Sequence, residues 1–81
     1  MNDKQIQIAS KLLKLDSEEA RSYTSPIEGS EAIYVSVPTK GGDSLIVSPE
    51  GEVLYANSSV SYDVHVREFL AGRRTPIEAF Q

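Results

Sequence analysis

Cysteine and tryptophan are absent from the 81-residue chain, and histidine occurs once, as His65. Without cysteine there are no disulfides and no thiolate metal ligands, so packing must supply the stability. A metal ion would have to be held by His65 and carboxylates, of which Glu68 shares its predicted helical face. One histidine and one carboxylate do not make a site. We therefore expect no metal and no cofactor, and we interpret His65 as a surface residue interacting with Glu68.

Long apolar runs and an excess of positive charge are also missing. No stretch approaches the ~20 apolar residues needed to span a bilayer, and residues 1–15 lack the uninterrupted apolar region of a signal peptide. The chain carries 12 acidic and 8 basic residues, a net charge of −4 that disfavours binding to phosphate backbones. We expect a cytoplasmic protein that binds neither nucleic acid nor membrane.

Motifs of catalysis are missing as well. No serine lies in a G-x-S-x-G elbow, and Gly41-Gly42 is not followed by the Lys-Ser/Thr of a phosphate-binding loop. The single histidine has no evident orienting partner. We predict no catalytic residues and no enzymatic activity.

What the chain does contain is three runs of β-forming residues, at Ala32–Val37, Ser44–Val47 and Glu52–Ala56. The first gap carries Gly41-Gly42, and the second, Ser48–Gly51, is a Ser-Pro-Glu-Gly sequence typical of a type I turn. Gaps this short allow only antiparallel pairing, because a parallel partner needs a much longer crossover. The sequence therefore predicts a three-stranded antiparallel meander.

Amphipathic helices are predicted before and after the meander in the sequence, packed on one side of the sheet. Apolar residues at helical spacing follow a cap at Asn2 or Asp3, and Asp16 with Glu19 has the spacing of a capping box for a short second helix. Residues 24–30 are predicted as loop. Ser61 can cap a helix from Tyr62 to about Ala71, ended by Gly72 in the left-handed conformation. Its predicted buried stripe is Tyr62, Val66, Phe69 and Leu70.

Together these elements predict a single domain over residues 1–81. Its expected class is α+β, two-layer, with a three-stranded antiparallel β-meander and an N-terminal and a C-terminal helix (α-β-β-β-α).

Two groups of residues are candidates for binding. Alternation along the strands places Tyr34, Ile46 and Leu54 on the face away from the main apolar side, so the sheet has apolar surface on both sides. Arg73 and Arg74, just after the last long helix, could bind a carboxylate, a phosphate or an acidic partner surface, or only complement the helix dipole.

The stretch Gly42–Glu52 (G-D-S-L-I-V-S-P-E-G-E), continued through Val53 and into the Tyr62–Leu70 helix, resembles the small YrhB-like immunity-type domains. The resemblance covers about half of the chain, which departs from the pattern in lacking tryptophan. It implies an intracellular, non-enzymatic domain that binds and blocks a toxin. No residue role can be carried over from it.

The expected function is a small non-enzymatic protein-interaction module. Its partner would be another protein or a second copy of itself, with a homodimer formed through a sheet edge. The alternative is a small-ligand or anion-binding domain that uses Arg73 and Arg74.

Overall fold

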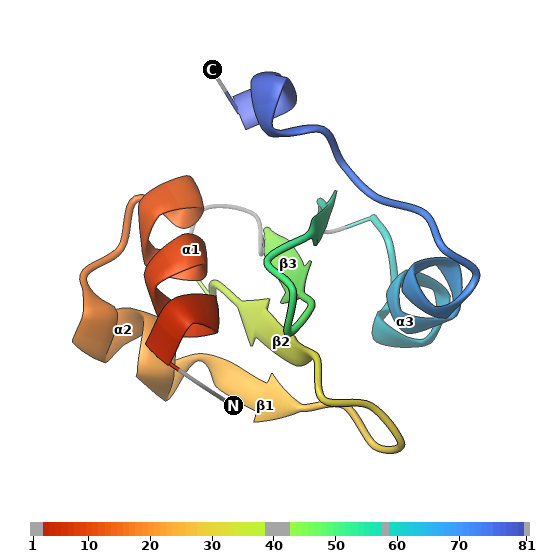
Figure 1. The fold of residues 1–81 in the computed structure, drawn as a ribbon, viewed down its shortest axis with the longest axis horizontal. Helices are drawn as coiled ribbons and strands as arrows, with labels where there is room; N and C mark the ends of the chain where they lie inside the picture. Colours follow the sequence, from red (N-terminus) through yellow and green to blue (C-terminus); the bar gives the residue numbers. More distant parts are fainter. Residues whose placement is uncertain (1–2, 39–42, 58, 81) are drawn as a thin grey trace.

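The computed structural model describes residues 3–38, 43–57 and 59–80 (Figure 1). Within them, no helix has the length and apolar character needed to cross a membrane. The predicted Asn2 cap and the Gly41-Gly42 turn lie outside the described residues. In chain order the elements are α1 (Asp3–Leu13), α2 (Ser17–Ser22), β1 (Thr24–Pro26), β2 (Ile33–Ser36), β3 (Ser44–Val47), β4 (Val53–Ala56), α3 (Tyr62–Leu70) and the 3-10 helix η1 (Ile77–Phe80).

The strands form one antiparallel sheet in the order β1-β2-β3-β4. Its last three strands confirm the predicted meander, with Val35 opposite Leu45 and Leu45 opposite Tyr55. The turn between β3 and β4 is also confirmed, because the Gly51 N–H donates to the Ser48 carbonyl at 3.0 Å. Gly51 itself has φ +97°, a conformation that other residues rarely adopt.

The number of strands corrects the prediction from three to four. Residues 24–26, predicted as loop, form β1, which pairs with β2 through Thr24 opposite Val35 and Pro26 opposite Ile33. By its local sequence preference alone, Ser25-Pro26 favours a turn. Proline is tolerated here because β1 lies at the edge of the sheet.

The two-layer arrangement is also corrected, because helices cover both faces of the sheet (Figure 1). Helices α1 and α2 lie on one face, where the first core consists of Ile6, Ala9, Ala20, Ile33, Val35, Leu45, Val47 and Val53. Helix α3 lies on the other, where the second core consists of Ile27, Ala32, Ile46 and Phe69. The α+β chain therefore has three layers, with the sheet in the middle.

The predicted helix caps are present. The Glu19 N–H donates to the Asp16 carboxylate at 2.8 Å, and the Asp16 N–H donates back to Glu19 at 3.3 Å, which completes the capping box. The Ser61 hydroxyl accepts from the Val64 N–H. At the end of α3, Gly72 has φ +101°, and the Arg73 N–H donates to the Glu68 carbonyl at 3.1 Å. This geometry is a Schellman ending.

Helix α1 ends in the same way but without a glycine, and this difference gives a stability prediction. Lys14 has φ +58°, and the following Leu15 N–H donates to the Ser10 carbonyl at 2.9 Å. Because glycine avoids the Cβ clash of this conformation, we expect Lys14→Gly to raise the free energy of unfolding by roughly 0.5–1 kcal/mol. Urea unfolding measures the change. The control Lys11→Gly, inside α1, should lower the free energy of unfolding by about 0.5–1 kcal/mol. A loss of stability in Lys14→Gly would contradict the left-handed conformation of Lys14.

Candidate functional site

The predicted binding face of Tyr34, Ile46 and Leu54 is not a free surface. Ile46 is 0% exposed, and Tyr34 and Leu54 are half-buried against the second core. The Tyr34 ring meets the Tyr62 ring edge to face, with centroids 4.7 Å apart. Phe69 of α3 belongs to the same core, so α3 is the element that covers this face.

The buried side of α3 agrees with the predicted stripe at Phe69 and Val66 and differs from it at the remaining positions. His65 and Phe69 are its buried residues, and Val66 packs beside them. Leu70, predicted to be buried, is 63% exposed, and Tyr62 is 43% exposed. The prediction of a surface His65 is wrong, because this side chain is only 1% exposed.

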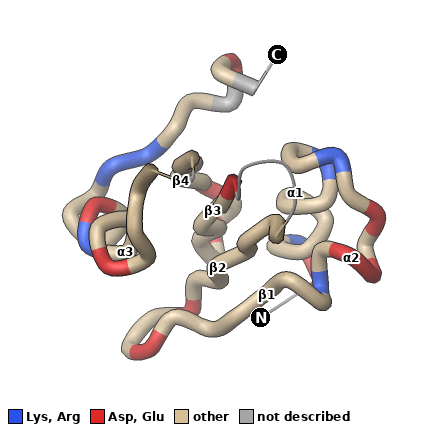
Figure 2. Tube along the Cα trace, turned by 180° about the vertical axis from the view of Figure 1, so that it is seen from behind, with Lys and Arg blue, Asp and Glu red and all other residues tan. Residues whose placement is uncertain are grey.

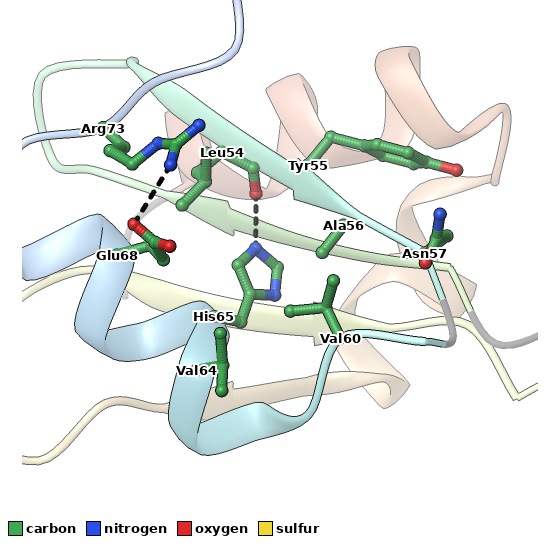
Figure 3. Close-up of a pocket in the computed structure, with 9 residues that line it drawn as sticks. All are labelled: Leu54, Tyr55, Ala56, Asn57, Val60, Val64, His65, Glu68 and Arg73. Atoms are coloured by element: carbon green, nitrogen blue, oxygen red, sulfur yellow. Dashed lines mark hydrogen bonds and ion pairs between the residues drawn. The ribbon is translucent and has the colours of Figure 1, made fainter.

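His65 links α3 to two strands, β3 and β4, and Figure 3 shows its bond to Leu54 of β4. Its Nε2 lies 2.7 Å from the Leu54 carbonyl oxygen. A carbonyl only accepts, so Nε2 carries the proton and donates. Nδ1 then accepts from the Ser44 hydroxyl at 3.1 Å. Burial lowers the pKa of His65, and the Leu54 hydrogen bond offsets part of that effect. The residue is thus a neutral structural link, and Glu68 interacts instead with Arg73 at 3.4 Å.

A pocket of about 280 Å³ opens between β4, α3 and the connector that joins them (Figure 3). Its apolar walls are Leu54 and Ala56 on one side and Val60 and Val64 on the other. The ion pair of Glu68 and Arg73 also lines it. The volume lies at the lower end of the range of roughly 300–1,000 Å³ that is usual for small-molecule sites.

Arg73 and Arg74 follow α3 as a basic stretch (Figure 2), but they do not converge on one point. Arg73 reaches Glu68, and its side chain is 69% exposed. Arg74 instead reaches the Glu52 carboxylate at 3.3 Å and donates to the Phe69 carbonyl at 2.9 Å. Its guanidinium also lies 4.0 Å from the centre of the Phe69 ring. The structure therefore does not bring the two arginines together in a shared anion site.

The outer edge of β4 carries a contact that sequence reasoning missed. The Thr75 N–H donates to the Val53 carbonyl at 2.8 Å, and the Tyr55 N–H donates to the Thr75 hydroxyl at 2.9 Å. At the same strand, burial and a hydrogen bond to Asp43 raise the pKa of Tyr55. Thr75 followed by Pro76 resembles a helix start, and nothing local indicates that it pairs with a strand.

Other kinds of site find no support in the described part of the chain. Over residues 3–38, 43–57 and 59–80, no three His, Asp or Glu side chains gather in a way that could hold a metal ion. Comparison with protein-family models, with curated proteins and with solved structures gave no match. The pocket and the edge of β4 are therefore the candidate site, on the strength of their geometry.

The burial of Ile46 gives a prediction that separates a core role from a contact role. We expect Ile46→Ala to lower the free energy of unfolding by about 2–5 kcal/mol, because it leaves a cavity under α3. Leu70→Ala, at the exposed end of α3, should change it by less than about 0.5 kcal/mol. Urea unfolding monitored by circular dichroism measures both. Equal effects of the two variants would contradict the described packing of α3.

His65 predicts a pH dependence of stability. Its folded-state pKa is lowered from 6.5, so folding favours the neutral ring. Stability should be unaffected by this group above pH 6.5 and should fall as the pH drops below 6.5 towards the lowered pKa. The measurement is urea unfolding of the wild type and of His65→Gln at about pH 7.5, 6.5 and 5.5. The stability of His65→Gln should fall less than that of the wild type as the pH drops below 6.5. Equal pH profiles of the two proteins would contradict the buried, neutral state of His65.

Proposed function

We propose that this chain is a non-enzymatic protein-interaction module whose contact surface is the outer edge of β4 with the adjoining pocket. The observation that carries the proposal is the apolar pocket lined by Val60 and Val64 directly beside a sheet edge. An extended segment that adds to a sheet edge gains main-chain hydrogen bonds, and a neighbouring pocket can take one of its alternate side chains. The partner would supply such a segment in place of Thr75, which bonds to the Val53 carbonyl and the Tyr55 N–H within the chain.

A protein partner has more support than a small ligand. The pocket is small, and both ring nitrogens of His65 already have partners in Ser44 and Leu54. The anion-binding alternative has less support, because Arg74 is committed to Glu52 and Phe69. The same engagement of His65, the chain's single histidine, supports a non-enzymatic role, because neither nitrogen is available to act as a general base.

The resemblance to YrhB-like immunity-type domains fits this proposal and makes it more specific. Such a module would act in the cytoplasm by covering the surface of a toxin. The alternative partner is a second copy of the chain, which would pair with the same sheet edge.

Photo-crosslinking tests the proposal. A benzophenone amino acid placed at Val64, in the pocket wall, should give a discrete covalent adduct in the native host cell. The matched control is the same amino acid at Glu18, which is exposed on α2, in the layer on the other face of the sheet. Val60→Asp, in the same pocket wall, should reduce the adduct at position 64. An adduct at both positions, or at neither, would overturn the proposed surface.

A further inference from the structure

Residues 73–75, here called the strap, already occupy the edge of β4. Just before β4, the Ser48 N–H donates to the Glu52 carbonyl at 2.8 Å. Since backbone groups alternate in direction along a strand, those of Leu54 point towards β3 and those of Val53 and Tyr55 point outwards. The strap bonds to these two residues.

Thr75 makes the contacts of a strand residue. In a parallel pair, one residue donates to the carbonyl before its partner and accepts from the N–H after it. Thr75 donates to the Val53 carbonyl and accepts from the Tyr55 N–H, with its hydroxyl oxygen in place of its own carbonyl. The position facing Leu54 therefore accepts an extended segment with a hydroxyl side chain.

Charge adds a second element of recognition. The edge is flanked by two acidic side chains, Glu52 before β4 and Glu68 on α3. The strap supplies a cation to each, Arg74 to Glu52 and Arg73 to Glu68. Arg74 also stacks over Phe69. The edge is thus complementary to a segment in which two basic residues precede a hydroxyl residue.

We propose that the outer edge of β4 is a recognition site for an extended Arg-Arg-Thr segment, held in cis by the strap and exchangeable with the strap of a second copy. The inference rests on the proposed function, because it names the segment that the same edge accepts. The opposite sheet edge is less suited to a partner, since β1 has three residues and one is Pro26, which has no N–H. The contacts of a partner's strap would be those seen within one chain.

The cis strap competes with any segment added in trans. A short connection gives it an effective concentration on the order of millimolar, so wild-type protein should bind a free segment only weakly. Arg74→Ala should loosen the strap, because it removes the contacts with Glu52 and Phe69. The full-length Arg74→Ala chain is therefore the receptor in the test.

The probe is a synthetic peptide with the sequence of residues 71–78, AGRRTPIE, capped at both ends. The readout is the Tyr55 backbone amide in ¹⁵N-labelled protein. We expect a saturable shift with Arg74→Ala and a Kd roughly tenfold lower than with the wild type. A matched peptide, AGRATPIE, lacks the arginine that meets Glu52 and should bind roughly tenfold more weakly. If Arg74→Ala does not fold, Thr75→Pro replaces it, since that change removes the strap's N–H donor and hydroxyl.

Three outcomes would overturn the inference. They are the absence of a Tyr55 shift in the loosened variant, equal affinity for the two peptides, and equal affinity of the wild type and the variant. Addition of Glu52→Gln to the receptor should weaken AGRRTPIE and leave AGRATPIE unchanged. A failed peptide test together with a specific adduct at position 64 refutes only this inference. Peptide binding without that adduct refutes the proposed pocket surface instead.

Discussion

The burial of β3 on both of its faces is the constraint on which the rest of the structure depends. All four of its residues are buried, with Leu45 and Val47 in the first core and Ile46 in the second. A strand that is apolar on both sides is stable only if something covers each side. In this chain α1 and α2 cover one face and α3 covers the other. The apolar residues on both faces of β3 therefore require a helical layer on each side of the sheet.

Each helical layer is fastened to the sheet by one buried polar side chain. Gln5 of α1 is 1% exposed, and its amide donates to the carbonyls of Glu31 and Val47 at 3.0 Å each. His65 of α3 does the same on the other face through Leu54 and Ser44. Apolar packing alone tolerates small shifts of a helix across a sheet, whereas a satisfied buried hydrogen bond fixes one position. His65 also lines the pocket beside α3.

Features decided by local chemistry could be predicted from the sequence, and features decided by distant contacts could not. The capping box at Asp16, the ending at Gly72 and the turn at Gly51 each depend on a few neighbouring residues. The burial of His65 depends on a serine and a carbonyl from two other elements, which helical spacing does not show. The same holds for the edge of β4, because Thr75 pairs with residues 20 or more positions earlier.

The arginine pair shows how sequence proximity can mislead. Two adjacent guanidinium groups suggest one anion site, but each of them meets a different carboxylate of the same chain, Glu68 or Glu52. An ion pair at an exposed position contributes little by itself, and Arg74 gains its hold from the Phe69 carbonyl and ring in addition to charge. The functional feature is therefore the outer edge of β4, against which the two arginines hold the strap. A partner that binds there must replace these contacts, and so its chemistry is constrained by what the strap already provides.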